Sequence, residues 1–232
     1  MTWYEELNFD TNPLDARPNP NLVGLDEEAE RLKNHIEKEE LCFLNGLTGS
    51  GKTSLLLKVQ NELKRYKFIY LDAQDLPKDF NLEEELKGQR NFFDRLTFRQ
   101  FPRKKPVLLI DEFQSTNPNL VLEARGKWES QDRKIKAVVI AQISKYLKNV
   151  SESFKDRLGN RIITLKPLDD SDMKKILEIR LHNKKNEFNY IKKFDEDAID
   201  LIIKVADGNA RRLLEYADIV FDFHHRSFKD IN

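Results

Sequence analysis

The 232-residue sequence contains one cysteine and no long apolar run. Cys42 therefore lacks a partner for an internal disulfide, and its position inside a short apolar segment is typical of a small buried side chain. No stretch approaches the roughly 20 apolar residues that a membrane-spanning helix needs. Met1–Asn12 is polar and aromatic, unlike the apolar core of a signal peptide. We expect a cytoplasmic protein without membrane contact.

The chain also lacks net charge, because forty Lys and Arg residues balance forty Asp and Glu residues. This balance excludes a protein that binds nucleic acid through its overall charge, so any such contact must come from a local patch. The four histidines lack the spacing to cysteines or acids that a zinc site requires. Repeats and low-complexity segments are absent.

Short apolar segments alternate with helical ones over residues 26–166. Such apolar strands, separated by helices, are typical of a parallel sheet covered on both faces. The sequence therefore predicts an α/β fold with a five-stranded parallel sheet and flanking helices. The expected strands are Leu41–Asn45, Phe68–Leu71, Val107–Asp111, Ala137–Ile143 and Arg161–Leu165. The expected helices are one opening at Asp26, then Lys52–Tyr66 and Leu120–Ser130, and Leu82–Phe101 is expected to be mostly helical.

Two further regions flank this predicted domain. Residues 1–25 include three prolines among Asn and Asp residues, a pattern that predicts an irregular arm rather than a helix. Strand signals stop beyond Pro167, so residues 167–232 are predicted to form a small all-helical lid. Its expected helices are Ser171–Leu181, Glu196–Ala206 and Asn209–Phe223.

The segment Gly46–Ser54 matches the P-loop pattern at every fixed position and lies between a predicted strand and a predicted helix. Glycines let backbone N–H groups turn toward phosphates, and the following helix points its positive dipole end at them. We expect Lys52 to reach the β- and γ-phosphates of ATP and the Thr53 hydroxyl to ligate Mg²⁺. The alternative is a glycine-rich turn without nucleotide, which the flanking strand and helix disfavour. The residues expected to contact ATP are Gly46, Leu47, Thr48, Gly49, Ser50, Gly51, Lys52, Thr53 and Ser54.

The apolar strand Val107–Asp111 ends in a pair of acids, Asp111 and Glu112. We expect Asp111 to hold Mg²⁺ through a water molecule and Glu112 to polarise the water that attacks the γ-phosphate. The alternative is a strand end that merely faces solvent. The P-loop upstream favours the catalytic interpretation, and Glu112 favours hydrolysis over transfer to a small acceptor.

With these motifs the chain resembles AAA+ ATPases, and within them the archaeal initiator group and the ExeA-type and transposition ATPases. The resemblance spans nearly the whole chain. It implies that Val23 and Gly24 contact adenine through backbone atoms. Asp111 and Glu112 open a D-E-x-Q segment similar to a variant found in the ExeA-type and transposition ATPases.

The resemblance also implies residues that sense the γ-phosphate. Gln142 or Ser144 stands where the family carries its first sensor, and we favour Gln142. Arg157, within a D-R-L segment, would reach the ATP of a neighbouring subunit in a homo- or hetero-oligomer, with Arg161 as the alternative. Arg211, within a G-N-A-R segment that departs from the family's G-D-x-R, would be the second sensor and link the lid to the nucleotide.

Residues 90–105 mix aromatic side chains with positive charges. One interpretation is a nucleic-acid surface, on which bases stack against phenylalanines. The interpretation we favour is a helix whose core face carries Phe92, Phe93, Leu96 and Phe101 and whose wet face carries the cations.

These motifs predict an Mg²⁺-dependent ATPase that acts as a switch or loader on DNA or a DNA-bound complex. The main alternative is an ATP-binding protein-interaction switch with negligible turnover and no DNA contact, and a small-molecule kinase is a second. The chain ends soon after its last predicted helix, so we expect no winged-helix DNA reader.

Overall fold

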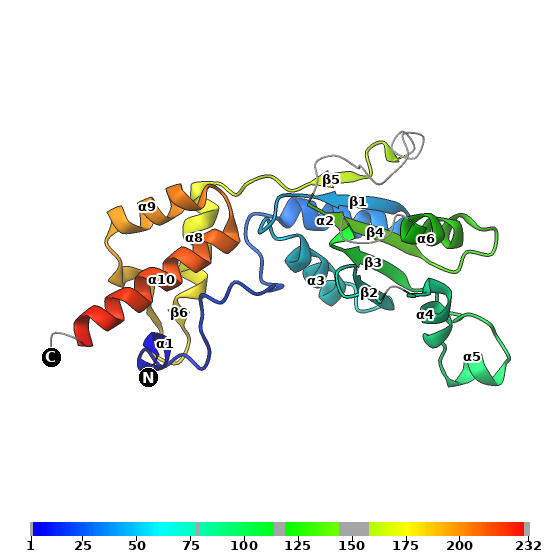
Figure 1. Cartoon of the computed structure of the whole chain (residues 1–232), viewed down its shortest axis with the longest axis horizontal. Helices are drawn as coiled ribbons and strands as arrows, with labels where there is room; N and C mark the ends of the chain where they lie inside the picture. The colour runs from blue at the N-terminus through cyan, green and yellow to red at the C-terminus, as the bar shows by residue number, and fades with distance from the viewer. Residues whose placement is uncertain (1, 78, 114–118, 144–157, 230–232) are drawn as a thin grey trace. The chain divides into compact units, whose positions relative to one another are not determined.

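The computed structural model describes residues 2–77, 79–113, 119–143 and 158–229, with no side chains described for residues 225–229 (Figure 1). The chain divides into two compact units. The first comprises Met1–Leu25, Thr48–Gly51 and Lys166–Asn232, and the second comprises Asp26–Leu47 and Lys52–Leu165. Each is described by itself.

The second unit is built on a five-stranded sheet with the order β2-β3-β4-β1-β5, in which every pairing is parallel. This confirms the predicted α/β fold, and the strand ends lie within one or two residues of those expected. The parallel order brings the carboxyl ends of β1, β3 and β4 to the same edge. The strands are β1 Leu41–Asn45, β2 Phe68–Asp72, β3 Val107–Asp111, β4 Ala137–Gln142 and β5 Ile162–Thr164.

The core of this unit lies on the three central strands, because every residue of β1, β3 and β4 is buried. Phe43 and Phe113 are among its largest fully buried side chains. Cys42 lies in the same strand core, and burial raises the pKa of its thiol from 9.0 to about 12. The thiol is therefore neutral and packs as a small apolar group.

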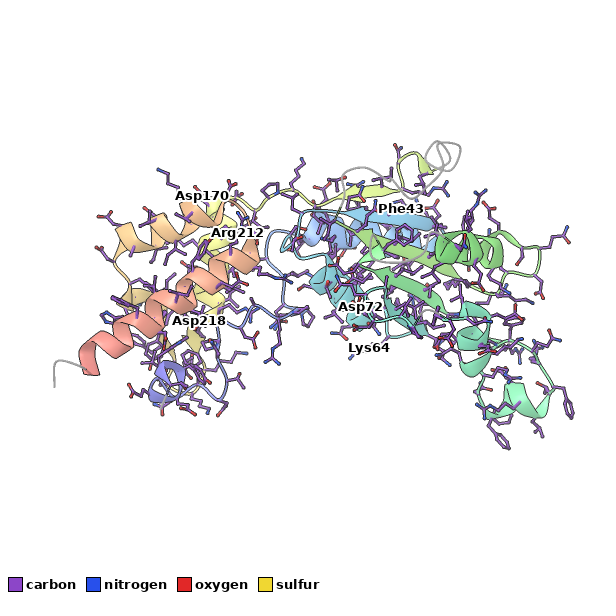
Figure 2. All side chains as sticks on the ribbon, viewed as in Figure 1. Phe43, Lys64, Asp72, Asp170, Arg212 and Asp218 are labelled. Carbon is purple, nitrogen blue, oxygen red and sulfur yellow. The ribbon has the colours of Figure 1, made fainter. Side chains whose placement is uncertain are left out.

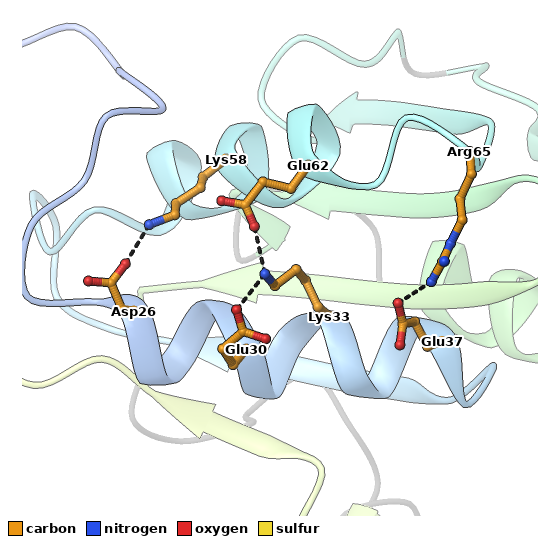
Figure 3. Close-up of polar contacts among 7 residues, drawn as sticks. All are labelled: Asp26, Glu30, Lys33, Glu37, Lys58, Glu62 and Arg65. Atoms are coloured by element: carbon orange, nitrogen blue, oxygen red, sulfur yellow. Dashed lines mark hydrogen bonds and ion pairs between the residues drawn. The ribbon is translucent and has the colours of Figure 1, made fainter.

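Helices α2 Asp26–Glu37 and α3 Lys52–Glu62 lie side by side and are joined by a row of ion pairs (Figure 3). Exposed ion pairs contribute only about 0–1 kcal/mol each. The larger stabilisation comes from the apolar side of α2, where Ala29, Leu32 and Ile36 are buried. The pairs Asp26–Lys58 and Lys33–Glu62 join the two helices, Glu37–Arg65 joins α2 to the residues just after α3, and Glu30–Lys33 lies within α2.

Residues 82–101 are mostly helical as expected, and they form two helices, α4 Leu82–Gly88 and α5 Phe92–Leu96. Asn91 and Asp94 form a capping box that starts a new helix. Helix α4 buries Leu82 and Leu86, and α6 Asn119–Glu129 also packs near it. Figure 1 shows α5 at the end of this unit, projecting away from the sheet.

The favoured core-facing interpretation of α5 is wrong. Phe92, Phe93 and Leu96 are 73%, 72% and 62% exposed, and of the four residues expected to face the core only Phe101 packs against it. Figure 2 shows the side chains of α5 extending away from the rest of this unit. A helical repeat of apolar residues shows that one face is apolar, but it does not show that a partner covers that face.

The first unit packs three helices around a second apolar core. It also contains the hairpin β6 His182–Asn183 and β7 Phe188–Asn189 and the short helix η2 Tyr190–Lys193, so the lid region is not all-helical. The three helices are α8 Asp170–Arg180, α9 Glu196–Ala206 and α10 Ala210–Lys229.

The N-terminal segment is not wholly irregular, because Trp3–Glu6 forms the short helix α1. Trp3 is buried and stacks on Phe221 of α10 with ring centroids 4.6 Å apart. Its indole N–H donates a hydrogen bond of 2.9 Å to Asp218. The prolines lie beyond this helix, so they did not prevent it.

Candidate functional site

The P-loop connects β1 to α3 as the sequence predicts, at the carboxyl edge of the sheet. Gly49 and Gly51 have φ angles of +80° and +93°, which only glycine adopts readily. The first turn of α3 contains no acidic residue that would compete with an anion at the helix N-terminus. The loop thus has the geometry of a phosphate cradle.

The Lys52 side chain is buried and folds back over this loop. Its ammonium group donates hydrogen bonds of 3.0 Å to the carbonyl oxygens of Gly46 and Leu47. The hydroxyl of Ser50 is also buried and has no hydrogen-bond partner within the described part of the chain. A buried ammonium and an unpaired buried hydroxyl are groups that phosphate oxygens would satisfy.

Asp111 at the end of β3 lies directly beside Thr53 at the start of α3. The Thr53 hydroxyl donates a hydrogen bond of 2.7 Å to Oδ2 of Asp111, whose side chain is buried. These are the two residues predicted to hold Mg²⁺, and both offer the hard oxygen atoms that this ion prefers. The arrangement fits a magnesium ion whose remaining ligands are phosphate oxygens and water.

Tyr70 of β2 belongs to the same cluster and was missed in the sequence. Its hydroxyl donates a hydrogen bond of 2.8 Å to Oδ2 of Asp111. Burial, followed by the nearby charge of Asp111, raises the pKa of the Tyr70 phenol above its usual value, so the phenol stays protonated as a donor. The available signal was one residue with a hydroxyl group, Tyr70, in an otherwise mainly apolar strand.

Glu112, the predicted water-activating acid, follows Asp111 in a left-handed backbone conformation with a φ of +49°. For a residue other than glycine this conformation costs about 1–2 kcal/mol. Its backbone N–H donates to Oδ1 of Asp111 at 2.9 Å. The conformation turns the chain sharply at the end of β3, and such strain concentrates at functional sites.

Gln142, the favoured first sensor, ends β4 opposite Asn45, the last residue of β1. Its side-chain amide donates a hydrogen bond of 3.2 Å to Oδ1 of Asn45, and both side chains are buried. Asn45 immediately precedes the P-loop, so this bond places Gln142 at the start of the loop. Asn45 was also not predicted as a site residue. The available signal was a polar residue at the end of an apolar strand, directly before the P-loop.

Asn209, in the segment predicted to carry the second sensor, contacts the tip of the P-loop within the first unit. Its side-chain amide donates a hydrogen bond of 2.8 Å to the carbonyl oxygen of Thr48. A Cβ atom at Gly49 would lie 2.3 Å from Oδ1 of Asn209 and 3.0 Å from Cβ of Arg211. Gly49 thus needs glycine for space as well as for its φ angle, and Arg211 lies beside it.

The residues predicted to contact adenine lie in the first unit. Val23 is buried, and Gly24 has a φ of +74°. A Cβ atom at Gly24 would meet the carboxylate of Asp172 at 2.3 Å and the side chain of Leu168 at 2.9 Å. The role of this pair in base recognition stays a prediction.

The predicted trans-acting arginine, Arg157, lies outside the described residues, as does the alternative first sensor Ser144. The alternative arginine, Arg161, lies just before β5, and its Nε atom donates to the carbonyl of Leu158 at 3.2 Å. Among the residues that the structure describes, no helix is long and apolar enough to span a membrane, and no group of three or more His, Cys, Asp or Glu side chains forms a metal cluster.

A protein-family model identifies the family of this chain. A family model described as an AAA domain (AAA_14) matches residues 38–174, more than half of the chain. The chain belongs to this AAA domain family. The matched range contains the P-loop, the acid pair and Gln142. A search of curated proteins found no match.

Solved structures share the fold of this AAA domain protein. The Orc1 protein of Aeropyrum pernix, solved in complex with DNA, has a TM-score of 0.66 at 21% identity over 89% of this chain and 61% of its own. Cdc6p of Pyrobaculum aerophilum has a TM-score of 0.64 at 16% identity over 89% and 63%. The RuvB Holliday junction branch migration motor of Thermotoga maritima has a TM-score of 0.55 at 18% identity over 83% and 60%. This chain therefore spans less than two thirds of each, and the likeness concerns the fold alone.

Proposed function

We propose that this AAA domain protein binds Mg·ATP at the P-loop and hydrolyses it. We further propose that turnover changes its affinity for DNA or for a DNA-bound protein complex. One observation carries the nucleotide part. The Thr53 hydroxyl donates a hydrogen bond of 2.7 Å to the Asp111 carboxylate, and the preceding residue, Lys52, is buried with its ammonium group over the P-loop. These are the cation-binding and phosphate-binding groups of a P-loop enzyme, brought together from β3 and α3.

Each residue has a definite task in this proposal. Lys52 exchanges its two carbonyl partners for β- and γ-phosphate oxygens, and the backbone amides of residues 46–54 bind the phosphate chain. Thr53 and Asp111 hold Mg²⁺, which neutralises charge on the phosphates. Glu112 accepts a hydrogen bond from the attacking water, whose oxygen bonds to the γ-phosphorus as the bond to ADP breaks. Gln142 orients the γ-phosphate from the end of β4.

Nucleotide binding and turnover are tested separately. Titration calorimetry with Mg·ATP gives the affinity, and a phosphate-release assay gives the rate. We expect Lys52→Ala to abolish binding, and Glu112→Gln to retain binding while lowering turnover by about 100-fold or more, because general base catalysis contributes roughly 10²–10⁴-fold. Unchanged affinity in Lys52→Ala would refute the site. Tight binding without phosphate release in the native protein would identify a nucleotide switch rather than an ATPase.

The DNA part of the proposal is supported by the fold shared with Orc1, which was solved in complex with DNA, and with the RuvB Holliday junction branch migration motor. Its test is the ATPase rate with and without duplex and single-stranded DNA. We further propose that the chain assembles, with Arg157 completing the ATP site of a neighbouring subunit. Mass photometry with a non-hydrolysable ATP analogue should show an assembly that Arg157→Ala weakens and Arg161→Ala leaves intact. The reverse result would assign the role to Arg161.

A further inference from the structure

Helix α5 and the turn after it expose a set of large apolar side chains, the phenylalanine face, made of Phe92, Phe93, Leu96 and Phe98. Their exposed fractions are 73%, 72%, 62% and 94%. Fully burying such a side chain contributes about 1.5–3 kcal/mol, so leaving four in water forgoes considerable stability. Clustered exposed apolar residues mark interaction surfaces rather than random surface composition.

The phenylalanine face rests on an ordered scaffold. The carboxylate of Asp94 is buried and accepts hydrogen bonds from the backbone N–H groups of Asn91 and Arg103, both at 3.1 Å. Its own carbonyl oxygen accepts one from the N–H of Arg99 at 3.0 Å. One residue thus ties together the start of α5, the turn after it and the segment that leads to β3. The aromatic rings are therefore carried by a backbone whose conformation is fixed by hydrogen bonds.

Phe98 has a backbone conformation that its side chain does not favour. Its φ is +53°, in the left-handed region, where a residue other than glycine costs about 1–2 kcal/mol. The ring is the most exposed large apolar side chain in the described part of the chain. Glycine would make the same turn without strain, so neither packing nor the turn explains a phenylalanine here. Strain of this kind is typical of binding surfaces.

The segment that carries this face is rich in positive charge. Residues 90–105 contain six Lys and Arg residues and a single acid, Asp94, which is buried in the scaffold. A chain with zero net charge therefore carries a local excess of five positive charges at this point. Within the described residues no ion pair joins the exposed members to a carboxylate. The exposed members, here named the cationic set, are Arg95, Arg99, Arg103, Lys104 and Lys105.

We propose that α5 and its following turn bind single-stranded nucleic acid, with bases stacked on the phenylalanine face and phosphates paired with the cationic set. Aromatic rings interleaved with cations along one segment match a strand in which bases and phosphates alternate. This surface is distinct from the ATP site, and binding at it does not require nucleotide.

Other occupants fit the charges and rings less well. In a duplex the faces of the bases are already stacked on one another, so the exposed rings would have no stacking partner. A second copy of this chain would bring the same positive set against itself.

The experiment is fluorescence anisotropy of a labelled 20-nucleotide oligothymidylate titrated with the full chain, without ATP. Stacking contributes about 1–3 kcal/mol per base, so Phe92→Ser/Phe93→Ser should weaken binding by at least about tenfold. The matched control is Leu201→Ser/Val205→Ser, which alters side chains that are 61% and 52% exposed on α9. This control should leave the affinity unchanged.

Charge is tested with a second matched pair. Lys104→Ser/Lys105→Ser should weaken binding and lower the magnitude of the salt-dependence slope by roughly 0.7 for each phosphate that is no longer neutralised. Lys175→Ser/Lys204→Ser removes two exposed charges from the lid helices and should change neither quantity. Lys52→Ala should bind the oligonucleotide normally, which separates this proposal from the ATP site.

Several results would overturn the proposal. They are no binding by the native chain, equal binding by Phe92→Ser/Phe93→Ser and its control Leu201→Ser/Val205→Ser, or equal or tighter binding of a blunt duplex. Binding to phosphatidylserine vesicles that the phenylalanine variant abolishes, without oligonucleotide binding, would assign the face to membranes. Self-association that the same variant abolishes, again without oligonucleotide binding, would assign it to a second copy. Unchanged melting temperatures verify that the variants fold.

Discussion

The hydroxyl of Tyr70 donates a hydrogen bond of 2.8 Å to the same carboxylate oxygen of Asp111 that the Thr53 hydroxyl contacts. Asp111 is therefore held from two sides, by β2 and by α3. A buried carboxylate held in this way keeps its position as a ligand exchanges for one of its partners. Tyr70 is thus a positioning residue for the magnesium site that we propose.

Tyr70→Phe removes one of these hydrogen bonds while keeping the ring. A bond to a charged group is worth about 1.5–3 kcal/mol, so we expect the Mg²⁺ concentration for half-maximal ATPase activity to rise by roughly tenfold. Affinity for ATP without Mg²⁺ should not change. Tyr66→Phe, on a ring outside the site, is the control. An unaltered Mg²⁺ dependence would show that Thr53 alone positions Asp111.

Two glycine-to-alanine changes should have opposite effects on stability. At Gly49 a methyl group would meet Asn209 at 2.3 Å on a backbone with a φ of +80°, so Gly49→Ala should destabilise the first unit by about 1–3 kcal/mol and impair ATP binding. Gly126 lies within α6 with no heavy atom within 4 Å of the added carbon. Gly126→Ala should stabilise the protein by about 0.5–1 kcal/mol.

Both effects can be measured by urea denaturation followed by circular dichroism, with nucleotide titration of each folded variant. Destabilisation by Gly126→Ala would contradict the open environment that the structure gives to that position.

Cys42 makes stability fall at high pH. Burial raises the pKa of its thiol from 9.0 to about 12, so between these values the unfolded chain releases a proton that the native chain retains. The free energy of unfolding should decline by about 1.4 kcal/mol per pH unit across this window through Cys42 alone. Below pH 9 this contribution should be constant.

The measurement compares the native chain with Cys42→Ala from pH 8 to pH 11. Alanine leaves a small cavity that lowers stability equally at every pH, so the difference in slope reports the thiol. A thiol reagent should modify Cys42 only in denaturant. Rapid modification of the folded protein would contradict its burial.

Trp3 secures the N-terminal segment to the last helix of the first unit. Trp3→Ala removes the ring stacked on Phe221 and leaves Asp218 without the indole donor, so we expect a loss of about 3–5 kcal/mol in the stability of this unit. Trp3→Phe keeps the stacking and should lose about 1.5–3 kcal/mol, because it removes only the hydrogen bond to the carboxylate of Asp218. Equal losses in the two variants, measured by thermal unfolding, would show that the hydrogen bond dominates.

Much of the fold and of the candidate site could be predicted because the signals are local. The strand Val107–Asp111 is five consecutive residues ended by a carboxylate, and the P-loop is a contiguous pattern that a phosphate chain imposes. Tyr70 and Asn45 could not be predicted in the same way. Their partners, Asp111 and Gln142, are distant in sequence, and only the sheet register brings them together.

The error at α5 has a different physical origin. Helical periodicity correctly grouped Phe92, Phe93 and Leu96, but burial depends on what the rest of the chain places opposite them. The capping box formed by Asn91 and Asp94 was visible in the sequence and marked a new helix start. At the N-terminus the prolines led to the prediction of an irregular arm. The packing of Trp3 could not be predicted, because its partners lie more than 200 residues away in the sequence.

The stacking of Trp3 on Phe221 also sets an order of events during synthesis. The first unit draws on both ends of the chain, whereas the second is complete once residue 165 has been made. On the ribosome the sheet-bearing unit can therefore fold before Phe221, the stacking partner of Trp3, has been synthesised. Until then the N-terminal segment presents an unburied indole, so its burial is one of the last steps in folding the chain.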